Sequence, residues 1–319
     1  MSQIRRFAPH ALVLAFAAWC VFALRGDLAQ VSLAPALHSW DLIVAAVVLT
    51  LVSYTARVAR WRFYLARLGH RLPGGFAALT FIAGFAYTLS PGKVGEMVRA
   101  RYYLPLGVPL SRVAAAFFAE RLLDLVAMAV LAALLFAGSA QYRAVAFIAG
   151  ALVAAILVFV AVLPWQTLAT RAESLTWVPR LMRSTLVSAA RTLVETRPLL
   201  RLVPLLLGFS VALFAWGLEG LGFDVLAGIL PALHLPVMTG VGIYAVAALV
   251  GGVSFLPGGL GSTEAVMTTL LVTHGCTIGE AVFVTLACRL VTLWLAVGLG
   301  WIAVFLLRNR PLAVASPWQ

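Results

Sequence analysis

The sequence contains little charge, because Asp, Glu, Lys and Arg together make up 11% of the 319 positions, whereas hydrophobic residues make up 63%. A soluble globular domain carries about twice that fraction of charged residues. A water-soluble fold cannot bury so many apolar side chains, so the bilayer must serve as the solvent. The composition therefore excludes a soluble protein and predicts an all-α polytopic membrane protein with a single transmembrane domain over 1–319.

Lysine is almost absent: 22 of the 23 basic residues are Arg, and Lys93 is the single Lys. Most of the arginines lie in short stretches between apolar runs. This distribution indicates a topology signal and contact with anionic headgroups, and no nucleic-acid partner is expected despite the net charge of +12.

Metal-binding and catalytic motifs are also missing. The three cysteines, Cys20, Cys276 and Cys288, lack metal-ligand spacing and lie in or beside apolar runs. The sequence contains no P-loop, no HExxH and no G-x-S-x-G motif. We expect no catalytic residue, no metal, no cofactor and no enzymatic activity.

Six apolar runs are candidates for full transmembrane helices. They cover about 8–24, 42–55, 113–136, 145–163, 202–221 and 281–307. The first follows Arg5 and Arg6 like a signal peptide, but no small-x-small cleavage site precedes Arg25, which favours a retained signal-anchor helix.

Two further apolar segments, 76–104 and 241–273, are interrupted near their middles by Pro and Gly. Each half is shorter than the roughly 20 residues that a helix needs to cross a bilayer. We therefore predict two re-entrant helical hairpins. Their turns contain Ser90, Pro91, Gly92, Gly95, Pro257, Gly258, Gly259, Gly261 and Ser262.

The region 165–200 is different, because it is rich in arginine and polar residues. It predicts a cytoplasmic linker with an amphipathic helix near 180–196 that lies at the membrane interface. With the N-terminus inside, predicted cytoplasmic loops contain 18 basic residues, including Arg99 and five arginines in 57–71, against two in outer loops. This asymmetry predicts a bacterial-type cytoplasmic (inner) membrane protein with both termini cytoplasmic.

A shift of 168 positions relates the two interrupted segments: Glu96 falls on Glu264 and Arg121 on Arg289. The matching regions are about 41–138 and 209–307. Three predicted crossings separate the hairpins, so the second enters from the opposite side of the membrane. This inverted repeat is typical of secondary transporters, whose broken helices meet near the midplane; the alternative is a chance similarity of two Gly-rich apolar stretches.

The broken hairpins leave helix ends with unpaired backbone groups. Helices beginning near Lys93 and Ser262 would point their positive N-termini toward the protein's middle, where they could bind an anion. Lys93 would add a full charge there. Alternatively, Ser90, Ser262, Glu96 and Glu264 only cap these helices.

Arg121 and Arg289 lie within long apolar runs, where an ionisable residue is a functional candidate because its burial is costly. Arg121 can be neutralised locally by Asp124 and Glu120. Arg289 has no such neighbour, so it must reach a distant carboxylate, a backbone carbonyl or a lipid phosphate, and the candidate carboxylates are Glu264 and Glu96.

The predicted headgroup or proton path comprises the charged residues of both repeats. These are Lys93, Glu96, Arg121, Asp124, Glu264 and Arg289. Two more acidic residues, Glu219 and Asp224, lie near the outer end of the fifth apolar run, where we expect them to be solvated.

Residues 89–99, LSPGKVGEMVR, followed by ERLLD at 120–124, resemble the first signature of the lysylphosphatidylglycerol synthase transmembrane family. Residues 256–264, LPGGLGSTE, with Arg289 resemble its second signature. The resemblance implies a flippase-like protein with broken helices around a lipid headgroup path. Since the chain ends at Gln319, directly after the last apolar run, a stand-alone member without an aminoacyl transferase domain is expected.

Three functions follow from these features. The first is a flippase that moves an anionic phospholipid or lipid-linked headgroup, with membrane lipids as partners. The second is an ion-coupled transporter of a small anionic solute. The third is a non-transporting partner of a lipid-synthesising enzyme. A lateral opening lined by apolar residues would favour the flippase, and a closed aqueous cavity would favour the ion-coupled transporter. Tightly packed hairpin tips would favour the non-transporting partner.

Overall fold

The computed structural model describes residues 39–136, 163–174, 179–230, 233 and 235–308. Within these ranges the chain forms helices and no strand, which confirms the predicted all-α fold. The apolar runs predicted over 8–24 and 145–163 lie outside the described residues.

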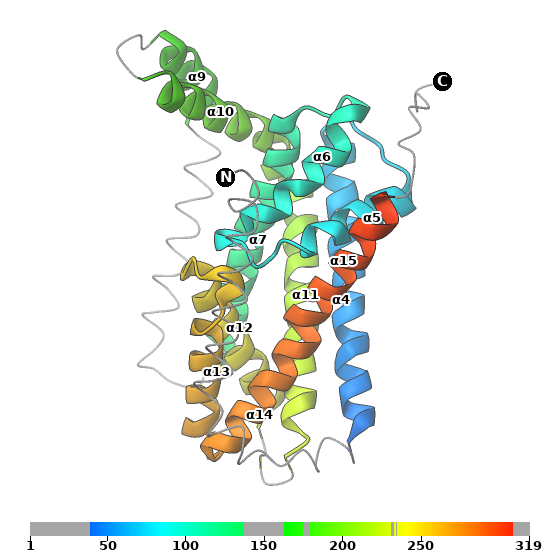
Figure 1. Ribbon diagram of the computed structural model, residues 1–319. Helices are drawn as coiled ribbons and strands as arrows, with labels where there is room; N and C mark the ends of the chain where they lie inside the picture. Colours follow the sequence, from blue (N-terminus) through cyan, green and yellow to red (C-terminus); the bar gives the residue numbers. More distant parts are fainter. Residues whose placement is uncertain (1–38, 137–162, 175–178, 231–232, 234, 309–319) are drawn as a thin grey trace, which may run out of the picture.

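Long helices form the frame of the molecule (Figure 1). Among the described residues, three helices are long and apolar enough to cross a membrane: α4 (Trp40–Arg67), α11 (Leu202–Ala227) and the continuous helix Ile278–Arg308. The last consists of α14 (Ile278–Arg289), a π-helical turn (Leu290–Trp294) and α15 (Leu295–Arg308). α7 (Leu110–Phe136) is equally long but carries four charged residues. The predicted end of the second apolar run near residue 55 is wrong, since no Gly or Pro stops α4 before Arg67.

Each interrupted segment folds back on itself as a helical hairpin. The first consists of α5 (Gly74–Phe85), a 3₁₀ segment (Pro91–Arg99), α6 (Ala100–Tyr103) and a short 3₁₀ turn (Leu104–Leu106). The second consists of α12 (Val237–Val253), a turn (Pro257–Gly259) and α13 (Ser262–Thr273). A shift of 168 places the last residue of α5 on the last of α12, and the first of α7 on the first of α14.

The two hairpins approach from opposite ends of the bundle, and their tips meet near its middle (Figure 1). The ring of Phe255 in the second tip packs over Gly92 in the first. In return, the side chain of Leu89 packs over Gly258. Both hairpins therefore border the same central region.

The return of the first hairpin differs from the prediction. Gly92 and Lys93 have φ of 59° and 57°, and the following residues form a 3₁₀ segment until α6 begins at Ala100. Gly95 tightens this turn, because a Cβ there would lie 2.6 Å from both the Ser90 Oγ and the Tyr87 carbonyl oxygen. The helix predicted to begin near Lys93 is therefore a 3₁₀ segment, whereas α13 begins at Ser262 as expected.

Polarity is reversed relative to a soluble protein. Large apolar side chains are exposed on α4, α11 and α15, among them Val44, Val48, Leu51, Leu206, Leu207, Phe214, Ile302 and Phe305. Charged side chains are buried instead: Arg57, Arg60, Glu96, Arg99, Glu120, Asp124 and Glu219. Apolar outer faces around a polar interior suit a protein surrounded by lipid.

A helical pair lies at one end of the bundle, beside the start of α7 (Figure 1). It consists of α9 (Trp165–Ser174) and α10 (Arg180–Thr196). The bounds of α10 match the amphipathic helix predicted near 180–196. The Arg112 guanidinium, at the start of α7, lies 3.4 Å from the Glu195 carboxylate and so ties the end of α10 to the bundle.

Candidate functional site

A central cavity of about 290 Å³ lies where the two hairpin tips meet. Its charged lining consists of Arg57, Lys93, Glu96, Arg121, Asp124, Glu219 and Arg289. Aromatic and aliphatic side chains form the rest of the wall, including Tyr54, Phe85, Met128, Trp216, Phe255, Leu256 and Leu293. The wall is therefore both charged and apolar.

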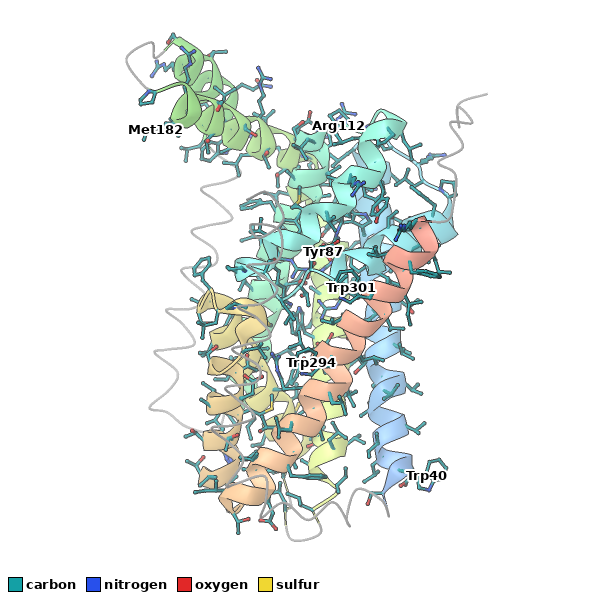
Figure 2. The ribbon with its side chains drawn as sticks, in the orientation of Figure 1. Trp40, Tyr87, Arg112, Met182, Trp294 and Trp301 are labelled. Carbon is teal, nitrogen blue, oxygen red and sulfur yellow. The ribbon has the colours of Figure 1, made fainter. Side chains whose placement is uncertain are left out.

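Helix α15 closes one side of the first hairpin. Tyr87 and Trp301 lie next to each other there, with ring centroids 5.7 Å apart (Figure 2). A close backbone approach makes this packing possible, because a Cβ on Gly300 would lie 2.2 Å from the Ala86 amide nitrogen. The contact fixes the first tip against the helix that also carries Arg289.

Glu96 lies in a dense network of charges. Its carboxylate accepts hydrogen bonds from Thr88 Oγ1 at 2.9 Å and from Arg99 Nη2 at 2.8 Å. Arg99 is completely buried and also donates to Glu120 at 3.2 Å. Its guanidinium lies 4.4 Å from the ring centroid of Trp61, and at the same distance from that of Phe81. Hydrogen bonds and cation–π contacts thus compensate the cost of burying this arginine.

Asp124 is surrounded by three arginines from two helices. Arg60 Nη2 donates to it at 2.8 Å, and Arg57 Nη1 lies 3.5 Å away. Arg121 Nη2 lies 3.1 Å from Asp124 and 3.5 Å from Glu120. The structure therefore places Arg121 beside the two local carboxylates that the sequence suggested.

Glu219 is a site residue that the sequence reasoning missed. It is buried rather than solvated, and it accepts hydrogen bonds from Ser53 Oγ at 2.8 Å, Arg57 Nη2 at 2.8 Å and Tyr244 Oη at 2.5 Å. It lies on the α11 face that also buries Ala212, Ala215, Trp216 and Phe223. Their spacing of three and four residues marks this inward face. Asp224, one residue beyond Phe223, is partly exposed.

Arg57, Arg60 and Arg99 were expected in cytoplasmic loops but are buried in this network. The error for the first two follows from ending the second helix too early. On a continuous helix, Ser53, Arg57, Arg60 and Tyr64 share one face, and that spacing was available in the sequence. These three arginines therefore give no information about orientation.

The second half contains a simpler pair. Arg289 Nε donates to Glu264 Oε1 at 2.6 Å, and Arg289 Nη2 donates to the Gly258 carbonyl at 2.7 Å. The Gly261 amide donates to Glu264 Oε2 at 2.7 Å. Arg289 thus reaches one predicted carboxylate and a backbone carbonyl, and the two side chains remain 12% and 17% exposed.

Capping explains only part of the polar residues at the tips. Ser90 Oγ accepts the Gly95 amide at 2.5 Å, and Glu264 accepts the Gly261 amide. Ser262 Oγ instead donates to the Gly259 carbonyl at 3.1 Å. Glu96 contacts side chains, so its carboxylate is not a helix cap.

Lys93 differs from the other cations of the cavity, because it forms no ion pair among the described residues. Its Nζ lies 5.7 Å from the ring centroid of Trp216, while the guanidinium carbon of Arg57 lies 4.3 Å from that ring centroid. Within the same ranges, Trp216 Nε1 and Arg121 Nε are buried donors without a hydrogen-bond acceptor.

Comparison with known proteins places these features in a family context. The profile of the family described as the lysylphosphatidylglycerol synthase TM region matches residues 10–300. The match contains both hairpins and every residue that lines the cavity. No curated protein matches the chain.

Proposed function

The chain belongs to the lysylphosphatidylglycerol synthase transmembrane family, and we propose that it moves a lipid with an anionic headgroup between the two leaflets of a membrane. The observation that carries this proposal is the central cavity between the hairpin tips. Its charged groups suit a headgroup, and its apolar wall suits the adjoining acyl chains. The chain acts here as a transporter and not as an enzyme.

The hairpins are proposed as re-entrant elements of an inverted repeat. Their equivalent helix ends at a shift of 168, and their approach from opposite ends, support this view. So does the recurrence of one Glu–Arg pair in each half: Arg121 Nη2 lies 3.9 Å from Glu96, and Arg289 Nε lies 2.6 Å from Glu264. Such repeats place a substrate site near the midplane of the membrane.

The end that carries α9 and α10 is proposed to face the cytoplasm of a bacterial-type inner membrane. Exposed arginines gather at this end, among them Arg62, Arg67, Arg101 and Arg201. At the opposite end, residues 228–230, 235–239 and 273–280 contain neither Lys nor Arg. This asymmetry persists after the three buried arginines are removed from the comparison.

A lipid is favoured over a small water-soluble anion by the edge of the cavity. Phe255 and Leu256 line the cavity and are 71% and 40% exposed. Apolar side chains at an opening suit acyl chains that stay in the bilayer while the headgroup crosses. A sealed aqueous route would not favour exposed apolar groups at its mouth.

The Glu264–Arg289 pair acts as the exchangeable contact in the proposed mechanism. An anionic headgroup entering between the tips competes with Glu264 for the Arg289 guanidinium. Release of the headgroup lets the pair reform, which returns the second tip to its resting position. Protonation of Glu264 or Glu96 would favour the separated state, which gives a route for coupling to a proton gradient.

The test is lipid translocation in proteoliposomes with labelled anionic phospholipids. Wild type is compared with Glu96→Gln, Glu264→Gln and Arg289→Ala, and with Asp41→Asn as a control, since Asp41 is exposed at the start of α4. We expect translocation by wild type and the control, and losses of about tenfold or more in the three variants. Unchanged transport in all three would exclude the site. Transport of a soluble anion alone would favour the ion-coupled transporter. If neither is transported, a non-transporting partner of a lipid-synthesising enzyme would be favoured.

A further inference from the structure

We propose that the cavity selects headgroups that carry one net negative charge, in the form of a phosphodiester, and disfavours zwitterionic headgroups. The inference rests on the proposed function for the arrival of a lipid at the cavity. It specifies the net charge of the preferred headgroup, and it assigns Lys93 and Trp216 as the residues that determine this selectivity.

The charged network around the cavity contains more cations than carboxylates. Six cations belong to it or line the cavity: Arg57, Arg60, Lys93, Arg99, Arg121 and Arg289. Five carboxylates face them: Glu96, Glu120, Asp124, Glu219 and Glu264. The described residues therefore leave one positive charge uncompensated. Away from water, such a charge is costly, and a single anion neutralises it.

The uncompensated positive charge can be assigned to one residue. Each carboxylate that lines the cavity has an arginine nitrogen at 2.8 Å: Arg99 for Glu96, Arg60 for Asp124 and Arg57 for Glu219. The lining residue Arg289 lies 2.6 Å from Glu264. Arg121 lies 3.1 Å from Asp124, so among the lining cations of the described ranges Lys93 alone forms no ion pair. The surplus charge is therefore localised on its ammonium group, above the Trp216 ring.

The unpaired polar groups at the cavity are all hydrogen-bond donors. Among the described residues that line the cavity, Trp216 Nε1 and Arg121 Nε are buried without an acceptor, and the Lys93 ammonium forms no ion pair; all three are donors. A phosphodiester offers two non-bridging oxygens that accept hydrogen bonds and share one negative charge. These two oxygens can accept hydrogen bonds from the Lys93 ammonium, Trp216 Nε1 and Arg121 Nε, and their single negative charge balances that of Lys93.

The same arrangement disfavours an ammonium group on the headgroup. The carboxylates that line the cavity, Glu96, Asp124 and Glu219, each already accept an arginine, so a headgroup ammonium there would face Lys93 without a free anion. Burial of an unpaired charge against a like charge costs affinity. A phosphomonoester carries two negative charges, and the single unpaired cation would neutralise only one of them. The preferred class is thus a diester without a compensating amine.

The experiment measures dissociation constants for labelled lipids with the purified full-length chain in detergent. The probes are phosphatidylglycerol, phosphatidylethanolamine and phosphatidic acid, with inorganic phosphate as a competing soluble anion. We expect wild type to bind phosphatidylglycerol about tenfold or more tightly than phosphatidylethanolamine, since a charge-assisted hydrogen bond has this magnitude. Phosphatidic acid should bind less tightly than phosphatidylglycerol.

Lys93→Gln should reduce the preference for phosphatidylglycerol to about threefold or less, whereas Lys93→Arg should retain it. Arg101→Gln is the matched control, because Arg101 is an exposed cation of the same hairpin outside the cavity. Trp216→Phe keeps the ring and removes the N–H, so it should weaken phosphatidylglycerol binding several-fold even if Lys93→Gln fails to fold.

Equal binding of the first two lipids by wild type, or an unchanged preference in both Lys93→Gln and Trp216→Phe, would overturn the proposal. Displacement of lipid by millimolar phosphate would identify a soluble anion as the ligand and would also overturn it. Selective binding without translocation would reject only the flippase function. Translocation of both lipids at equal rates would reject only the charge rule.

Discussion

The two hairpins carry a glutamate at equivalent positions, but the surroundings of Glu96 and Glu264 differ. Glu96 is 1% exposed and contacts Arg99, Arg121 and Thr88. Glu264 contacts one arginine, Arg289, and its side chain is 17% exposed. At the shift of 168, three charged residues of the first half correspond to uncharged ones: Arg99 to Met267, Glu120 to Cys288 and Asp124 to Thr292.

This difference indicates that the two halves of the proposed repeat have different tasks. In the first half, Glu96, Arg99, Glu120 and Asp124 each have several partners, so losing one contact leaves other buried charges uncompensated. In the second half, one pair at the edge of the cavity can open without exposing further charges. We therefore expect the first half to maintain the fold and the second to undergo the movement.

The largest effect is expected for Arg99→Met, which gives the first half the residue found in the second. Glu96 and Glu120 would each lose a buried arginine, and the free energy of unfolding should fall by about 3–5 kcal/mol. Denaturation in mixed micelles measures this change. Met267→Leu, a volume-conserving change at the buried equivalent position, should cost less than about 1.5 kcal/mol. Equal stability of the two variants would contradict the proposed division.

A smaller loss is expected for Gly84→Ala, and its counterpart is a matched control. A Cβ on Gly84 would lie 3.2 Å from Arg99 Nε and 3.3 Å from the Glu96 carbonyl oxygen. A Cβ on Gly252 would meet only Leu125, at 3.9 Å. Gly84→Ala should lower the melting temperature, with a cost of about 1–3 kcal/mol, because the guanidinium has no room to move.

Gly252→Ala should be neutral or slightly stabilising, since Ala favours a helix over Gly by up to about 1 kcal/mol. The same thermal denaturation in detergent measures both variants. If both glycines tolerate Ala equally, the tight packing of Arg99 is not what distinguishes the halves.

Sequence reasoning located the elements better than the partners. Pro and Gly spacing identified both hairpins, and polar periodicity identified α10, because these signals are local. The Arg289–Glu264 contact could be anticipated, since few carboxylates were within reach of an unpaired arginine. Arg57 and Glu219 are 162 residues apart in the sequence and lie on different helices. No local pattern specifies such a contact. The 3₁₀ return after Lys93 could not be predicted either, because it depends on the close approach of Gly95 to Ser90 and Tyr87 within the turn, which no periodicity of the sequence indicates.

Glu264→Gln should change transport more than stability. Gln retains an oxygen for the Gly261 amide but lacks the charge that attracts Arg289. The free energy of unfolding should therefore be about 1–2 kcal/mol lower than in wild type. Lipid translocation should fall about tenfold, because the pair can no longer restore the resting state. Parallel measurement of denaturation and translocation tests this separation. A loss of stability as large as that of Arg99→Met would show that the second pair also maintains the fold.

The smallest effect concerns the bases of the hairpins. At the first, Arg112 Nη1 lies 2.9 Å from His70 Nε2. Partial burial, and then the Arg112 charge, lower the pKa of His70 below its ordinary value of 6.5. At the second, His274 Nδ1 lies 2.7 Å from the Leu270 carbonyl oxygen of its own helix.

A lowered pKa in the folded state means that the unfolded chain binds the proton more tightly. The contribution of His70 to stability is therefore complete above pH 6.5 and declines as the pH falls from there toward the folded-state pKa. Between pH 7.5 and 5.5 the melting temperature of wild type should fall further than that of His70→Gln. The difference should be small, because His70 is partly solvated. His274→Gln controls for removal of a surface histidine. An identical pH dependence in wild type and His70→Gln would show that the Arg112 contact does not influence the base of the first hairpin.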